Sequence, residues 1–163
     1  MKVLWIGHNL AYPRKGGALQ RNYYLLRQAA AHAEVHFLAF DQPRTRPPDV
    51  QPDDCIKALL EFCSSADWVS LSPAGGRLHR HMTAVQGLVS KESYEVHWLR
   101  SRLLQTKLVR LLDQHRFDVV HFDTLGLAQY MPLANHCGTV LNHHDVQSAL
   151  MLRRMKREKN PLL

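Results

Sequence analysis

Two histidines and an aspartate stand in a row near the carboxyl end of the chain, in the stretch Asn142-His143-His144-Asp145. These residue types bind divalent metals or carry protons. Consecutive residues at a strand end point in opposite directions, so His143 and His144 are poorly placed to share one ion. We therefore expect no metal here and favour a positioned imidazole that binds substrate or stabilises developing charge.

A second acidic position, Asp123, follows the predicted strand Asp118-Val119-Val120-His121-Phe122. A carboxylate at the end of a strand could accept hydrogen bonds from the hydroxyl groups of a polyol. The same residue type also caps helices, and a helix beginning near Leu125 could use Asp123 in that way. The sequence leaves both interpretations open. His121 lies inside the run and is interpreted as a hydrogen-bonded core residue.

The pair Gly16-Gly17 stands directly ahead of a stretch with helical periodicity. Glycines in this position let the backbone approach a ligand closely, and the N–H groups and dipole of the helix attract an anion. The pair completes neither a P-loop nor a dinucleotide-binding fingerprint. A simple turn explains it equally well.

Nucleophilic catalysis finds no support in the sequence. There is no G-x-S-x-G elbow, and the three cysteines are scattered, with no C-x-x-C pair. Their spacing predicts neither a zinc site nor a disulfide framework, and we expect buried thiols.

The chain is basic, with 21 Lys and Arg against 14 Asp and Glu and a formal net charge of +7. Such a balance favours anionic partners, although a solvated basic surface gives the same number. We expect no nucleic-acid partner, because the basic residues are dispersed and no nucleic-acid motif is present. The carboxyl-terminal tail could lie on anionic lipid or form an ordinary solvated helix face. Its charged residues are Arg153, Arg154, Lys156, Arg157, Glu158 and Lys159.

The elements that would position these residues alternate along the chain. We expect strands at 2–6, 34–40, 67–71, 118–122 and 139–142, and helices at 18–33, 54–63, 78–89, 99–115 and 145–159, the last capped by Asp145. This alternation predicts one α/β domain over residues 1–163 with a doubly wound parallel sheet sandwiched by helices. Ligands bind such sheets beyond the carboxyl ends of the strands, which selects the loops 7–17, 123–126 and 142–146.

These segments in this order resemble the amino-terminal half of a GT-B glycosyltransferase, and within that fold the retaining family four. The likeness lies in the first strand, the loop Pro13-Arg14-Lys15-Gly16-Gly17, the run ending at Asp123 and the segment 140–148. The tail, with Leu152-Arg153-Arg154 and Asn160-Pro161-Leu162, is similar to sugar transferases associated with exosortase and exopolysaccharide loci. The resemblance implies a Rossmann-like, acceptor-binding domain.

The resemblance also implies roles for individual residues. It places Gly16 and Gly17 near the donor diphosphate and makes His144 the catalytic contact to the transferred sugar. Arg14 and Arg21 become candidates for anionic groups on the acceptor. The remaining substrate-binding positions are Asp123, Asn142, His143 and Asp145.

The implied reaction moves a sugar from a nucleotide-sugar donor to a glycan or lipid-linked acceptor, as in a hexosyltransferase, without a metal or other cofactor. The donor would be bound mainly by a carboxyl-terminal domain that has no counterpart in these 163 residues, so we expect this chain to be inactive by itself. We expect a cytoplasmic location, either free or peripheral on the inner face of a membrane. The alternative function is a non-catalytic module that binds phosphorylated ligands or an anionic membrane surface.

Overall fold

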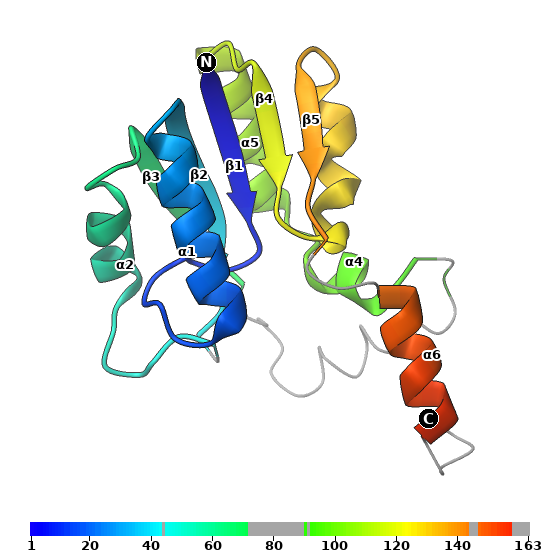
Figure 1. The fold of residues 1–163 in the computed structure, drawn as a ribbon. Helices are drawn as coiled ribbons and strands as arrows, with labels where there is room; N and C mark the ends of the chain where they lie inside the picture. Colours follow the sequence, from blue (N-terminus) through cyan, green and yellow to red (C-terminus); the bar gives the residue numbers. More distant parts are fainter. Residues whose placement is uncertain (44, 72–89, 91, 144–146, 158–163) are drawn as a thin grey trace.

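One parallel sheet forms the centre of the protein. The computed structural model describes residues 1–43, 45–71, 90, 92–143 and 147–157. The five strands are all parallel and lie in the order β3-β2-β1-β4-β5 (Figure 1). They span β1 Lys2–Gly7, β2 Glu34–Asp41, β3 Ser65–Ser70, β4 Val119–Phe122 and β5 Gly138–Leu141. The expected α/β fold with a Rossmann-like parallel sheet is confirmed.

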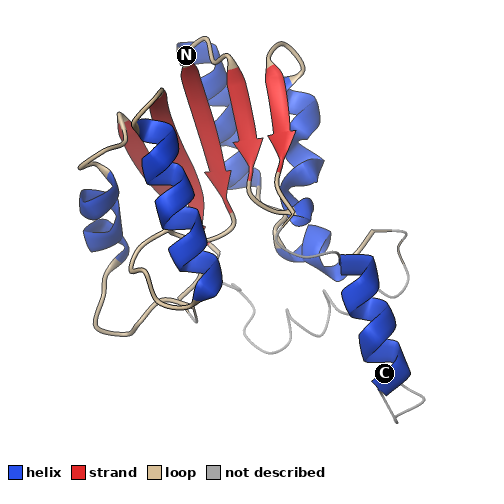
Figure 2. Cartoon of the chain, in the orientation of Figure 1, coloured by secondary structure: helices blue, strands red, loops and turns tan. Residues whose placement is uncertain are grey.

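Helices flank the sheet on both faces. The described helices are α1 Gly17–Ala30, α2 Pro52–Leu59, α4 Tyr94–Trp98, α5 Arg102–Gln114, the 3-10 helix η1 Leu125–Ala134, and α6 Gln147–Arg157. Figure 2 shows α1 and α2 over one face of the sheet and α5 with η1 over the other. No helix in the described ranges is long and apolar enough to cross a bilayer.

The central strands β1 and β2 are largely apolar on both sides because both of their faces are covered. Within β1, Leu4 and Ile6 pack in the core under α5, whereas Val3 and Trp5 pack in the core under α1 and α2. All but the first residue of β2 are buried. The lack of polar alternation in these runs therefore reflects burial on two faces.

Several element boundaries differ from the sequence expectation. The helix expected at 18–33 ends at Ala30, the helix expected at 54–63 spans Pro52–Leu59, and the chain before α5 also differs. Ser101 caps this helix by accepting a hydrogen bond from the backbone N–H of Leu104 at 3.3 Å, so the helix begins at Arg102 and not at Leu99. Leu99 instead closes α4, a short helix that the sequence did not predict. The helix expected at 78–89 lies outside the described residues.

The strand order defines where a ligand can enter. From β1 the chain moves to β2 and β3 on one side, and then crosses to β4 and β5 on the other. The direction of winding therefore reverses between β1 and β4. In open parallel sheets, the crevice beyond the carboxyl ends of the two strands at such a switch point is where ligands bind.

Candidate functional site

A buried carboxylate lies at this switch point. Asp123 follows β4 directly and is 0% exposed. Its backbone N–H donates to the carbonyl of Ile6 in β1 at 3.0 Å, which ties the two strand ends together. The carboxylate oxygen Oδ2 accepts from Nδ2 of Asn22 at 2.6 Å and lies 2.7 Å from Nδ1 of His8. The other oxygen lies 3.5 Å from Nδ2 of Asn142.

Four separate elements supply this polar cluster of His8, Asn22, Asp123 and Asn142. His8 comes immediately after β1, and Asn142 immediately after β5, where its N–H donates to the carbonyl of Phe122 at 2.8 Å. Asn22 comes from α1, next to the buried Tyr23 that anchors this helix on the sheet. The parallel order of the strands thus brings together residues as far apart in the sequence as His8 and Asn142.

The pair of His8 and Asp123 has the geometry of an oriented imidazole. When Nδ1 of His8 carries the hydrogen, it donates to the buried carboxylate and Nε2 becomes the basic atom of the ring. A carboxylate in this position fixes the tautomer and stabilises the imidazolium that forms when the ring takes up a proton. The His8 side chain is 19% exposed, while that of Asp123 is fully buried. The arrangement can accept a proton from a hydroxyl group placed beside it.

The interpretation of Asp123 as a helix cap is wrong. The segment that follows is the 3-10 helix η1, whose N-cap is Thr124, with no side-chain cap hydrogen bond. The carboxylate of Asp123 is used by the polar cluster and so does not satisfy the helix end. The hydroxyl of Thr124 donates instead to Oε1 of Glu95 at 2.6 Å.

The loop before α1 leaves room for a ligand at its two glycines. Gly16 has φ of 82°, a left-handed conformation that requires glycine. A Cβ added at Gly16 or Gly17 would meet no atom within 4 Å. The first turn of α1 carries no acidic residue, so its dipole is uncompensated at this end. These features fit an anion, and contact with a diphosphate remains a prediction.

The two predicted arginines lie in different surroundings. Arg21 donates from its guanidinium to Oδ1 of Asn142 at 3.3 Å and so joins the edge of the polar cluster. Arg14 lies over the ring of Tyr23 at 5.1 Å and donates to the hydroxyl of Tyr24 at 3.2 Å. That hydrogen bond raises the pKa of Arg14, which therefore stays charged.

Of the two histidines after β5, only His143 lies within the described residues. His143 is exposed, whereas His144 and Asp145 lie outside the described residues. The predicted catalytic imidazole of His144 therefore stays a prediction. His121 of β4 is partly exposed and stacks on Trp5 of β1 with the ring centroids 3.7 Å apart.

The sequence interpretation missed His8 and Asn22. His8 lies in the loop 7–17 that the strand rule selects, so it could have been chosen as the first titratable residue after β1. Asn22 is 3% exposed and lies one turn before the buried Leu26, and a polar residue on the apolar face of a helix was the available signal.

The cysteines take no part in this cluster. All three are free thiols, with Cys55 and Cys63 buried and Cys137 partly buried. Burial raises the pKa of Cys55 to about 11 and that of Cys63 to about 12. Across the ranges that the structure covers, no three His, Cys, Asp or Glu side chains gather closely enough to hold a metal ion.

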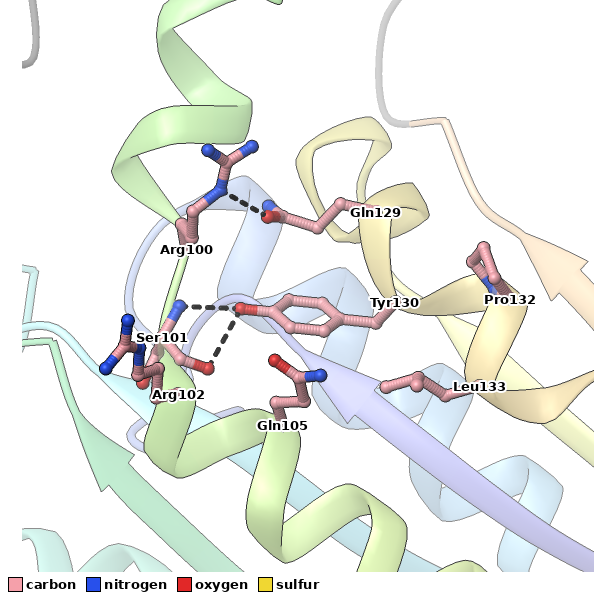
Figure 3. Close-up of a pocket in the computed structure, with 8 residues that line it drawn as sticks. All are labelled: Arg100, Ser101, Arg102, Gln105, Gln129, Tyr130, Pro132 and Leu133. Atoms are coloured by element: carbon pink, nitrogen blue, oxygen red, sulfur yellow. Dashed lines mark hydrogen bonds between the residues drawn. The ribbon is translucent and has the colours of Figure 1, made fainter.

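A cavity of about 260 Å³ opens elsewhere, between the start of α5 and η1 (Figure 3). The hydroxyl of Tyr130 accepts from the N–H of Ser101 at 2.8 Å and donates to the carbonyl of Leu99 at 2.7 Å. The amide of Gln129 donates to two backbone carbonyls at 2.8 Å. The cavity shares no residue with the polar cluster, and these groups already serve the fold. Its lining is Arg100, Ser101, Arg102, Gln105, Gln129, Tyr130, Pro132 and Leu133.

The candidate site therefore consists of the polar cluster, with Arg21 at its edge and the glycine loop before α1. Comparison with known proteins adds no assignment to it: no protein-family model matches the chain, and no curated protein matches its sequence significantly.

Proposed function

We propose that this chain is the acceptor-side domain of a GT-B type glycosyltransferase, which transfers a sugar from a nucleotide-sugar to a hydroxyl group of a glycan or lipid-linked acceptor. The observation that carries the proposal is the 2.7 Å contact between Nδ1 of His8 and the buried carboxylate of Asp123 at the switch point of the sheet. In this function His8 accepts the proton of the acceptor hydroxyl, and Asp123 keeps the ring oriented and stabilises its charge.

The neighbours of this pair suit a substrate rich in hydroxyl groups. Asn22 gives its Nδ2 hydrogen to Asp123, and its buried Oδ1 has no hydrogen-bond partner among the described residues. A buried acceptor atom of this kind calls for a donor, and a hydroxyl is one. Arg21 and Asn142 place a guanidinium and an amide at the rim. Polyol recognition uses such mixed donors and acceptors.

The role of His8 also bears on the stereochemistry of transfer. Direct attack by a base-activated hydroxyl, on the side opposite the leaving group, inverts the anomeric centre. The resemblance to family four implies retention. The anomeric configuration of a product formed with a donor-binding domain present therefore separates the two mechanisms: inversion supports proton transfer to His8, and retention rules it out.

The proposal is tested on the chain alone by NMR titration. Labelled protein is titrated with oligosaccharides and, separately, with nucleotide-sugars, while the ring nitrogens of His8 and the side-chain amides of Asn22 and Asn142 are followed. We expect oligosaccharides to shift these resonances and nucleotide-sugars to shift the backbone amides of Gly16 and Gly17.

The matched variants are Asp123→Asn, which alters the cluster, and Asp113→Asn, which removes an exposed carboxylate on α5. We expect the first to abolish the oligosaccharide shifts and the second to leave them intact. If no oligosaccharide moves the resonances of His8, Asn22 or Asn142 in the folded wild-type chain, the proposed acceptor site is wrong.

A second function is favoured by the loop before α1. The left-handed Gly16, the open space at Gly17 and the acid-free first turn of α1 would also suit a module that binds phosphorylated ligands without catalysis. The same titration separates the two. Shifts confined to Gly16 and Gly17 with simple phosphate esters, and absent with oligosaccharides, would favour the binding module.

A further inference from the structure

The last described helix, α6 (Gln147–Arg157), is cationic and amphipathic. Its sequence QSALMLRRMKR contains four Arg and Lys and no Asp or Glu. Leu152 is 48% exposed and Met155 is 69% exposed. The side chains of Arg153, Lys156 and Arg157 are exposed as well. The helix therefore presents large apolar side chains and cations to solvent together.

Helical spacing separates these two sets. Leu152 and Met155 are three residues apart and share one side of the helix. Arg153 and Arg157 are four residues apart and share another side, with Lys156 at the border between them. In Figure 1, α6 extends beyond the carboxyl ends of the strands and covers neither face of the sheet. Of the described residues of α6, neither Leu152 nor Met155 belongs to either core of the fold.

We propose that α6 docks this protein on an anionic lipid bilayer, lying in the plane of the interface. A helix with a cationic face and exposed Leu and Met on another side buries the apolar side chains at the level of the headgroups and places its cations beside lipid phosphates. A nucleic acid would use the cations and leave Leu152 and Met155 in water. The absence of any acidic residue in α6 and the net charge of +7 favour an anionic surface.

This docking stands independently of sugar transfer, but it has a consequence for the candidate site. Both α6 and the polar cluster follow the carboxyl ends of the strands, so α6 on a membrane would hold that edge of the sheet near the bilayer (Figure 1). A lipid-linked acceptor presents its hydroxyl groups at the same level.

Co-sedimentation with vesicles tests the proposal on the full chain. Vesicles of phosphatidylcholine containing phosphatidylglycerol are compared with vesicles of phosphatidylcholine alone. The charge variant is Arg153→Gln/Lys156→Gln/Arg157→Gln, and its matched control Arg27→Gln/Arg110→Gln/Arg116→Gln removes the same charge from exposed positions on the body. We expect the charge variant to bind about 100-fold more weakly, since each cation near the surface contributes about fivefold. The control should bind nearly as the wild type does.

The apolar side is tested by Leu152→Gln/Met155→Gln, for which we expect at least about a tenfold loss because two buried apolar side chains are removed. If this variant binds the vesicles as the wild type does, while binding heparin equally well, α6 is a general polyanion-binding helix and the proposal fails. Failure of the wild type to sediment with phosphatidylglycerol vesicles, or equal losses in the charge variant and its control, also overturns it.

A fluorescent probe gives a readout that charge alone does not move. Leu152→Trp is measured against the background of the three native tryptophans. In buffer we expect the emission of an exposed tryptophan. On adding phosphatidylglycerol vesicles we expect this emission to shift to the blue. Blue-shifted emission already in buffer would show that protein covers this side of α6, and would overturn membrane docking.

Discussion

Replacing Asp123 with alanine tests whether the polar cluster is as tightly organised as its geometry indicates. The side chain is 0% exposed and accepts hydrogen bonds from Asn22 at 2.6 Å and, in the tautomer that orients the ring, from His8 at 2.7 Å. The contact at 3.5 Å with Asn142 is at the limit of a hydrogen bond and contributes little. The substitution removes the carboxylate oxygen that the amide of Asn22 and the ring of His8 contact.

The size of the effect follows from the two short contacts. A hydrogen bond to a charged group contributes about 1.5–3 kcal/mol. Removing the buried carboxylate also removes its desolvation penalty, which offsets part of the loss. We therefore expect Asp123→Ala to lower the free energy of unfolding by about 3 kcal/mol. For a chain of this length, 1 kcal/mol corresponds to about 2–4 °C, so Tm should fall by about 6–12 °C.

Urea and thermal unfolding followed by circular dichroism measure both quantities. Asp113→Ala is the matched control, because Asp113 is an exposed carboxylate on α5, and its loss should stay within about 0.5 kcal/mol. In a double-mutant cycle, Asp123→Ala and His8→Ala should show coupling, since the two side chains are in contact. A loss in Asp123→Ala no larger than that in the control would refute our account of the cluster.

Three further substitutions and one thiol reaction test other parts of the structure. Arg46→Met leaves the buried carboxylate of Asp41 without the guanidinium that donates to it at 2.9 Å, so urea unfolding should show a loss of about 3 kcal/mol. Gly126→Ala places a Cβ 2.8 Å from two side-chain carbons and should cost about 1–3 kcal/mol in the same assay, whereas Gly17→Ala meets nothing within 4 Å and should be neutral or stabilising. Burial raises the pKa of Cys63 to about 12, so a disulfide reagent at pH 8 should modify this thiol only on unfolding; rapid reaction in the native protein would contradict its burial.

The order of the elements could be predicted from the sequence because each strand carries a local signal. Phe37–Phe40 within β2 is an unbroken apolar run, and residues 18–30 repeat their apolar positions every three or four residues. These patterns depend on neighbours in the chain, so they predict the α/β class. The sequence placed the start of α5 three residues too early. Leu99 fits the apolar pattern of this helix, but Ser101 is its N-cap, so the helix begins only at Arg102.

The composition of the site depended on contacts between distant residues. The sequence selected the loops that hold His8, Asp123 and Asn142, since the carboxyl ends of parallel strands lie at one edge. It could not choose between a cap and a ligand contact for Asp123, because both need the same residue at the same position in the chain. The structure decides against the cap, because the carboxylate of Asp123 contacts Asn22 and His8, which are 101 and 115 residues away along the chain; the ligand contact stays a prediction.

By itself, then, the sequence determined the α/β class, most of the strands and helices, and the edge of the sheet where the candidate site lies, because hydrophobic periodicity and strand ends are local properties. Only the tertiary structure paired His8 with Asp123 and buried Asn22 beside them. It also left Leu152 and Met155 of α6 in solvent. Strand order and helix packing decide these contacts. They join residues that are far apart in the sequence, so no local sequence pattern predicts them.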